Sequence, residues 1–392
     1  MDTCPVALYG AFGEFDEERV RNNCLKGVKW SPDGCCLLTA SEDQLLRVFE
    51  LPSEEPGGEE CSATTTEMRS VLRAREGDAI YDYSWYPRMD SSDPTTCCFV
   101  SASRDHPLHL WDAYTGHLRA SYSAHNHLDE VASGYSCAFD LTGGQIYCGS
   151  DRAVRVFDVS RPGRECSLRR TSKTKKSRVG QRGIISSFAF APDFSGLFAA
   201  GSYAGTTGLY VDNSPEMICL LGGHSGGVTQ LAFSHDALHL FSAARRDGSI
   251  HCWDVRNTCQ ILYSFARACP TNQRIGFHLA PDSRALISAS QDGRVLAFDT
   301  AHPGTDPVTW LSYPNAVNDA VLHPALPLLA VAVGERRFPL PSGGEGQGHD
   351  GEDVDGVEDE HPGHNGFTIW QLPQSQPAQP ELEQDPSMSV VS

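Results

Sequence analysis

The sequence lacks long apolar runs, and its cysteines are not spaced as metal ligands. No stretch approaches the roughly twenty apolar residues that a membrane-spanning helix needs. The N-terminal segment MDTCPVALYGAF has neither the charged nor the apolar region of a secretory signal. Two of the cysteine pairs are adjacent, Cys35/Cys36 and Cys97/Cys98, and none has C-x-x-C spacing. We therefore expect a soluble protein of the cytosol or nucleus whose cysteines are reduced thiols within strands.

Charged residues are also scarce, at 21% of the 392 residues, whereas the chain has 36 glycines and 24 prolines. This composition favours short strands and turns over long solvated helices, so we expect an all-β fold. The formal net charge is −19, and eleven of the acidic residues lie between Phe338 and Ser392, where lysine and arginine are missing. Much of the acidity is therefore local.

Seven copies of one unit run through the chain. In each copy a short apolar run ends in a large residue, a polar turn follows, and a strand of small residues leads through a second turn to a strand with a closing aromatic residue. The large residues are Trp30, Trp85, Phe139, Phe190, Phe233, Leu279 and Leu322. The closing aromatics are Phe49, Trp111, Phe157, Tyr210, Trp253, Phe298 and Trp370. Such a repeat predicts stacked units that bury a continuous core together.

An aspartate stands six positions before the closing aromatic in five of the units, where it can accept hydrogen bonds within a hairpin turn. The fifth unit has the fullest set of signature residues, which are Gly223-His224, Ser242, Asp247 and Trp253-Asp254. These signatures resemble the WD-repeat family, whose units are the four-stranded blades of a β-propeller. The resemblance implies a seven-bladed propeller over residues 1–371 and a structural tetrad of His224, Ser242, Asp247 and Trp253.

The N-terminal and C-terminal segments of the chain also allow structural predictions. Residues 6–9 are expected to close the ring as the outer strand of the last blade. Residues 334–366 interrupt that blade with a glycine-rich acidic segment, for which we predict disorder. Two roles are open for this insertion. It either solubilises the protein, or its carboxylates mimic RNA and compete with RNA for the arginines described below. Residues 372–392 are rich in glutamine and proline and predict a flexible tail.

The segment from Arg161 to Arg182 contains nine basic residues and one acidic residue, Glu165. Such a concentration of positive charge suits binding to the phosphates of RNA. We expect Lys175, Lys176, Arg178 and Arg182 to hold phosphates on the connection between the third and fourth blades; a solvated linker is the alternative.

The residue before each turn aspartate should point out of the same face. Of these, Arg104 and Arg246 can bridge phosphates or pair with guanine, and Tyr203 can stack on a base. Gln273 and Arg274 add donors at the entry to the sixth blade. Arg245 is either a further RNA contact or part of a structural ion pair. The alternative for all these arginines is pairing with neighbouring aspartates.

Several segments between the signatures resemble one branch of the WD-repeat proteins, the telomerase Cajal body protein family. They include LKGVKWSPDG, GDAIYDYSWY, HPLHLWDAYTGHLRASY, HNHLDE, GIISSFAFAP, LLGGHSGGVTQLAF and TNQRI. The resemblance runs from about Leu8 to Val333 and covers the propeller, without the long polar N-terminal extension of that family.

This second resemblance implies a non-enzymatic RNA-binding scaffold that recognises the CAB box, a short loop motif of small Cajal body RNAs and telomerase RNA. Such a scaffold directs these ribonucleoproteins to Cajal bodies and supports telomerase assembly and trafficking to telomeres. The implied partners are telomerase, box H/ACA ribonucleoprotein components and Cajal body proteins. The implied locations are the nucleus, Cajal bodies, telomeres and cytoplasm, with no membrane. The main alternative is a protein-only WD-repeat scaffold that binds acidic peptides.

Other constellations point away from catalysis and from cofactors. His125, His127, Asp129 and Glu130 have metal-ligating atoms, but their spacing in a polar loop is more typical of a solvated surface. His224 and Ser225 are adjacent and cannot adopt the geometry of a catalytic triad. We expect no enzyme activity, no metal and no cofactor. Tyr81, Tyr83 and Trp85 alternate as strand residues do, which predicts packing within a blade. Because ring closure joins remote parts of the chain, we also expect the cytosolic chaperonin to assist folding.

Overall fold

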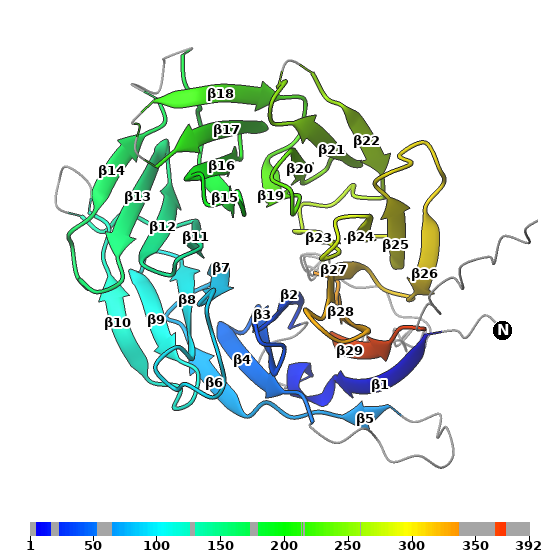
Figure 1. Cartoon of the computed structure of the whole chain (residues 1–392). Helices are drawn as coiled ribbons and strands as arrows, with labels where there is room; N and C mark the ends of the chain where they lie inside the picture. Colours follow the sequence, from blue (N-terminus) through cyan, green and yellow to red (C-terminus); the bar gives the residue numbers. More distant parts are fainter. Residues whose placement is uncertain are drawn as a thin grey trace, which may run out of the picture.

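The computed structural model describes residues 5–16, 23–52, 65–125, 130–172, 179–212, 214, 216–258, 260–336 and 365–373. These residues form seven β-sheets. Figure 1 shows the sheets arranged radially around one axis, with the first strand of each repeat innermost. The prediction of an all-β, seven-bladed propeller is confirmed.

The first three blades each contain four strands that follow one another outward from the axis. They are β2 (Leu25–Trp30), β3 (Cys36–Ser41), β4 (Leu45–Glu50) and β6 (Leu72–Arg75); β7 (Ile80–Trp85), β8 (Cys98–Ser103), β9 (Leu108–Asp112) and β10 (Leu118–Tyr122); and β11 (Ser136–Phe139), β12 (Gln145–Ser150), β13 (Ala153–Asp158) and β14 (Ser167–Arg170).

The next three blades repeat this order. They are β15 (Ile185–Phe190), β16 (Leu197–Ser202), β17 (Thr206–Val211) and β18 (Met217–Gly222); β19 (Val228–Phe233), β20 (His239–Ala244), β21 (Ser249–Asp254) and β22 (Tyr263–Ala266); and β23 (Phe277–Leu279), β24 (Ala285–Ala289), β25 (Arg294–Asp299) and β26 (Val308–Ser312).

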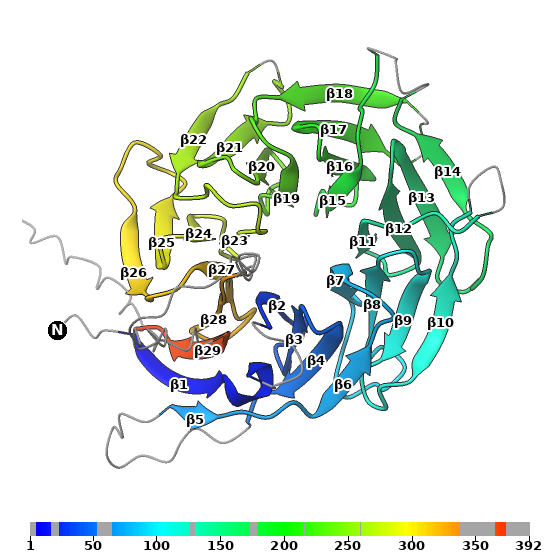
Figure 2. The ribbon, with the colours of Figure 1, turned by 180° about the vertical axis from the view of Figure 1, so that it is seen from behind.

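The seventh blade joins the two ends of the propeller. Its strands, from the axis outward, are β27 (Val317–Leu322), β28 (Leu328–Val333), β29 (Gly366–Gln371), β1 (Val6–Ala11) and β5 (Thr66–Glu67). The N-terminal strand β1 pairs antiparallel with β29, and β5 pairs parallel with β1 on its outer side. Both views show this order, seen from opposite faces in Figures 1 and 2. The ring is thus closed by residues from opposite ends of the sequence.

Polar contacts lock this closure onto the first blade. The Glu67 carboxylate accepts the backbone N–H groups of Phe12 and Gly13 at 2.9 and 3.0 Å. Past β1, in the short 3₁₀ helix η1 (Gly13–Phe15), the carboxylate of Glu14 lies 3.5 Å from the guanidinium of Arg47 on β4. The Arg47 side chain is fully buried, so removing its acidic partners would leave an uncompensated charge.

The core lies between neighbouring blades. One cluster combines Leu38 and Leu46 of the first blade with Tyr83, Trp85 and Phe99 of the second. The second strands carry small residues, as in TAS, SAS and GS, so that the sheets can approach one another. Burial of each large aromatic side chain contributes about 1.5–3 kcal/mol. Packing between blades therefore supplies much of the stability.

β-Bulges shape the innermost strands. The pairing register shifts at the same point in five blades, between Leu25 and Gly27, Ile80 and Asp82, Ile185 and Ser187, Val228 and Gln230, and Val317 and Asp319.

Residues directly after three of these bulges bond the next blade. Asp82 accepts the N–H of Cys137 at 3.2 Å, and Asp319 accepts the N–H of Val28 at 3.3 Å. Gln230 bonds both backbone groups of Phe277, at 2.6 and 3.1 Å. Polar side chains thus tie neighbouring blades together around the axis.

Some predictions fall outside the described residues. The predicted acidic insertion is described only at its ends, 334–336 and 365–366, and the predicted tail only at 372–373. The cysteines in the described part of the chain are free thiols, most of them buried. Within the same residues, no helix has the length and apolarity that crossing a membrane requires.

Candidate nucleic-acid interface

The turns between second and third strands share one face with the connections that enter the blades. The N–H of Arg104 bonds the carbonyl of Ala79 at 3.0 Å, and the N–H of Arg246 bonds the carbonyl of Thr271 at 3.0 Å. We call this the upper face.

A cavity of about 500 Å³ opens at the axis on this face. It is lined by residues of the innermost strands β2, β7, β19 and β27 and by the connection that enters β23. Five cationic side chains line it, namely Lys26, Lys29, Arg104, Arg274 and Arg336. In the described part of the chain two acidic residues line it, Glu42 and Asp319. The cavity is therefore locally positive in a chain whose net charge is −19.

Arg104 and Tyr81 form one wall of this cavity. The exposed Arg104 donates its Nε–H to the Tyr81 hydroxyl at 3.0 Å, and its guanidinium lies 6.0 Å from the centre of the Tyr81 ring. The Tyr81 ring lies 5.3 Å from that of Tyr135 at the start of the third blade. These contacts combine a cation with two neighbouring aromatic faces, which suits stacking of unpaired bases.

The prediction that Tyr81 packs within a blade is wrong. Tyr83 and Trp85 are buried, whereas Tyr81 is half-buried and lines the cavity. The bulge between Ile80 and Asp82 causes the difference, because it interrupts the strict alternation of the strand.

Tyr203 forms another part of the wall, from the fourth blade. Its side chain is 38% exposed and lies under the guanidinium of Arg245, 4.4 Å from the ring centre. Within the described part of the chain Arg245 makes no ion pair. The described contacts thus do not support the predicted structural ion pair, and the predicted RNA contact of Arg245 stays a prediction; the contact that the structure shows is with the Tyr203 ring.

Gln273 and Arg274 also line the cavity, but both are engaged with the protein. The guanidinium of Arg274 lies 3.1 Å from the carboxylate of Asp82, which belongs to the second blade. The Gln273 amide donates to Asn318 at 2.9 Å and to the carbonyl of Gly334 at 3.2 Å. These two residues position the connection into the sixth blade and offer fewer donors to a ligand than the sequence predicts.

Two further predicted RNA contacts, Arg182 and Arg246, are exposed on the upper face outside the cavity. Lys175, Lys176 and Arg178 lie outside the described residues. Of the predicted set, the structure thus brings together Arg104, Tyr203, Gln273 and Arg274, with Arg245 behind Tyr203.

The two carboxylates near the axis differ in their partners. Asp82 has two cations beside it, Arg274 at 3.1 Å and Lys29 at 3.5 Å. Among the described residues, Asp319 accepts hydrogen bonds only from the backbone N–H groups of Val28 and Ala320, at 3.3 and 3.1 Å. Burial raises the pKa of Asp319 to about 6, and the nearby Arg274 opposes this rise. Asp319 is therefore the less compensated of the two.

The fifth blade holds the residues predicted as a structural tetrad. His224 Nδ1 donates to the Asp247 carboxylate at 3.0 Å, and His224 Nε2 accepts from the Ser242 hydroxyl at 2.9 Å. Trp253 Nε1–H donates to the same hydroxyl at 3.0 Å. Burial lowers the pKa of His224, and the neighbouring His251 lowers it further. The four side chains form one buried hydrogen-bonded chain.

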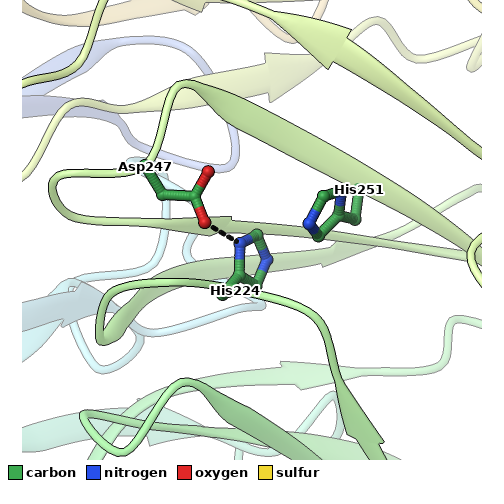
Figure 3. Close-up of side chains that lie close together, drawn as sticks. All are labelled: His224, Asp247 and His251. Carbon is green, nitrogen blue, oxygen red and sulfur yellow. Dashed lines mark hydrogen bonds and ion pairs between the residues drawn. The ribbon is translucent and has the colours of Figure 1, made fainter.

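One nitrogen each of His224 and His251 and one carboxylate oxygen of Asp247 lie within 4.8 Å of one another, as the ligand atoms of a metal would (Figure 3). Both nitrogens of His224 are already hydrogen-bonded, however. The rings of His224 and His251 stack 4.3 Å apart at 27°, so their in-plane lone pairs do not converge on one point. The arrangement therefore fits a structural network better than a metal centre.

Comparisons with known proteins agree with this geometry. The family model described as WD domain, G-beta repeat, matches residues 19–50 and 215–254. Telomerase Cajal body protein 1 of Homo sapiens is 46% identical over 351 residues, which cover 88% of this chain and 63% of the human protein. The protein of that name from Mus musculus is also 46% identical over 351 residues, covering 88% of this chain and 65% of the mouse protein. The Drosophila melanogaster homologue is 36% identical over 321 residues, covering 80% of this chain and 57% of its own length.

Seven blades, the hydrogen-bonded tetrad and the two matched repeats define a WD-repeat β-propeller. Along most of its length the chain is similar to the telomerase Cajal body proteins. The chain spans about 63% of the length of the human relative, so the similarity concerns the propeller.

Proposed function

We propose that this chain is a non-enzymatic RNA-binding scaffold. It recognises the CAB box of small Cajal body RNAs and telomerase RNA and directs these ribonucleoproteins to Cajal bodies. The observation that carries the proposal is 46% identity to a telomerase Cajal body protein over 88% of the chain. The partners would be telomerase and box H/ACA components and Cajal body proteins, and the sites of action the nucleus, Cajal bodies and telomeres, with synthesis and chaperonin-assisted folding in the cytoplasm.

The upper-face cavity supports this proposal chemically. RNA loops are bound through cations on phosphates and through planar side chains on unstacked bases. Arg104 and Arg336 are exposed cations at the cavity, and Tyr203 and Tyr81 are aromatic walls of it. In this arrangement phosphates bind the cations of the mouth, and a base enters between the tyrosines.

A salt titration with purified protein tests this function. The full chain is titrated with an RNA hairpin that carries the CAB box and with the same hairpin after its loop is scrambled. We expect a preference of at least tenfold for the intact loop, about 1.4 kcal/mol, and a steep loss of affinity with added salt. Equal, weak binding to both hairpins would contradict loop recognition by the propeller.

The same cationic mouth suits an acidic peptide, which is the protein-only alternative. Co-purification of partner proteins before and after ribonuclease treatment separates the two. The RNA proposal predicts that ribonuclease releases the ribonucleoprotein partners. Partners that stay bound after complete RNA digestion would favour the protein-only scaffold.

A further inference from the structure

The carboxylate of Asp319 faces the upper-face cavity from the innermost strand of the seventh blade. A carboxylate offers about four acceptor positions. Two are used here, by the N–H groups of Val28 and Ala320. No cation lies within ion-pair distance of Asp319 in the described part of the chain. Asp319 thus brings unused acceptor capacity into a cavity whose other charged groups are mostly cations.

Two glycines make room for this carboxylate. A Cβ atom added at Gly276 would lie 2.1 Å from Oδ1 of Asp319, and one added at Gly27 would lie 3.0 Å from Oδ2. Neither glycine has a positive φ, so the space for Asp319, rather than the backbone conformation, explains the absence of a side chain. The carboxylate is therefore held at one defined position between the first and sixth blades.

The chemistry of the cavity narrows the class of ligand. The free acceptors of Asp319 call for a group with N–H donors, while the five cations of the lining disfavour a cationic peptide. A nucleotide meets both demands, since it carries N–H groups on its base and negative charge on its phosphate. A volume of about 500 Å³ lies within the range of small-ligand pockets, so one base can be enclosed.

The four RNA bases present different edges to a carboxylate. Guanine offers two adjacent donors, N1–H and N2–H, which match two carboxylate oxygens. Adenine and cytosine each place one amino group beside a ring nitrogen acceptor, and uracil places one N–H between two carbonyl oxygens. Those acceptors would repel the carboxylate.

We propose that the upper-face cavity takes one unpaired guanine, which Asp319 recognises through its N1–H and N2–H groups. The guanine ring stacks against Tyr81 and Tyr203, and the phosphate faces Arg104 and the other cations at the opening of the cavity. This inference rests on the proposed RNA-binding function and adds a base preference and a reading residue to it. The guanine belongs either to an RNA loop or to a free nucleotide, and the phosphates on both sides of a loop guanine favour the first.

The test uses RNA hairpins with one stem and a uridine loop that carries a single guanosine, inosine, adenosine or cytidine, or no substitution. Affinity for the full chain is measured by fluorescence anisotropy at fixed salt. We expect the guanosine loop to bind at least tenfold more tightly than the adenosine, cytidine and all-uridine loops. Inosine lacks the N2 amino group, so its loop is expected to lie between these extremes.

Variants assign the preference to Asp319. Asp319→Asn keeps the shape of the side chain and its contact to Val28, and is expected to reduce the guanosine preference to less than threefold. Gly276→Ala keeps the carboxylate but displaces it, with the same expected loss. Asp292→Asn is the matched control, because it removes one charge from a turn outside the cavity, where Asp292 bonds Arg294 at 2.8 Å. The control is expected to keep the full preference, and thermal unfolding establishes that each variant is folded.

Each outcome decides a different point. Binding of all loops with equal affinity by the wild-type protein would overturn the inference and leave the RNA-binding function standing. A guanosine preference that survives in folded Asp319→Asn would overturn the role of Asp319. No binding of any of these hairpins would overturn the inference, and the proposed function would stand if the hairpin with the CAB box still binds under the same conditions; absence of binding to that hairpin as well would refute the proposed function. Guanosine 5′-monophosphate is titrated alone, and affinity equal to that of the guanosine loop would show that the ligand is a free nucleotide.

Discussion

The interior of the fifth blade and the upper-face cavity use similar polar residues in opposite ways. In the blade, the donors of His224 and Trp253 meet acceptors, and the His224 side chain is only 3% exposed. In the cavity, Asp319 keeps free acceptors and Tyr203 remains 38% exposed. A fully satisfied network thus stabilises the fold, whereas unused hydrogen-bonding capacity in a cavity is typical of a binding surface.

The largest effect is expected from loss of ring closure, because the fifth blade and the upper-face cavity both depend on a closed ring. Deleting residues 1–15 removes β1 and Glu14 and leaves the buried Arg47 without this acidic partner. We expect loss of cooperative unfolding or a fall of more than about 10 °C in Tm, since several kcal/mol of packing are lost. Differential scanning calorimetry of the truncated and intact chains measures this. An unchanged cooperative transition would contradict the role of β1.

The next largest effect is expected inside the fifth blade. Asp247→Ala removes the acceptor of His224 Nδ1 and of the Ser225 N–H. We expect a loss of about 3 kcal/mol in the free energy of unfolding, because buried donors are left unpaired. RNA affinity of the folded variant should stay within twofold of wild type.

Urea denaturation measures the stability, with Asp292→Ala as the control in the corresponding turn of the sixth blade. That control should cost less than about 1 kcal/mol, because its ion pair is exposed. A large loss of RNA affinity in folded Asp247→Ala would break the distinction between the two regions.

The cavity should show the reverse pattern. Arg104→Ala and Tyr203→Ala are each expected to lower RNA affinity about tenfold, about 1.4 kcal/mol, through loss of a phosphate contact and of a stacking face. The urea midpoint should hardly change, since both side chains are exposed. Arg256→Ala is the matched control, because Arg256 is an exposed arginine that pairs with Asp254 away from the cavity. Equal losses for all three variants would indicate non-specific electrostatics.

His224 in the fifth blade and Asp319 in the cavity are expected to change the pH dependence of stability in opposite directions. The pKa of His224 is lowered by burial, so the unfolded chain binds more protons below about pH 6.5, and acidification destabilises the fold through the blade. The pKa of Asp319 is raised to about 6, so acidification from pH 6 to 4 relieves the cost of its buried charge.

Asp319→Asn removes this opposing contribution. Its stability should therefore fall more steeply than that of wild type between pH 7 and 5, by about 1 kcal/mol. Urea midpoints across this range measure the effect, and parallel curves for the two proteins would contradict it.

The repeated local pattern made the fold predictable, whereas the cavity depends on contacts between distant residues. The seven anchors and closing aromatics indicate seven blades, because every unit carries the same apolar spacing. The strand β5 between β4 and β6 carries no such pattern and was not predicted.

The alternation of the strand gives the wrong position for Tyr81, because strict alternation does not reveal the β-bulge beside this residue. The contact between Arg274 and Asp82 joins residues 192 positions apart, which no local pattern encodes. Asp319, Gly27 and Gly276 come together only where the first, sixth and seventh blades meet.

The most direct test of the account compares two RNAs on two proteins. A hairpin with the CAB box and its scrambled counterpart are bound to the wild-type chain and to the double variant Arg104→Ala/Tyr203→Ala at near-physiological salt. The account predicts at least a tenfold preference for the intact loop in the wild type and its loss in the folded double variant. The same preference in both proteins would contradict the claim that the upper-face cavity reads RNA.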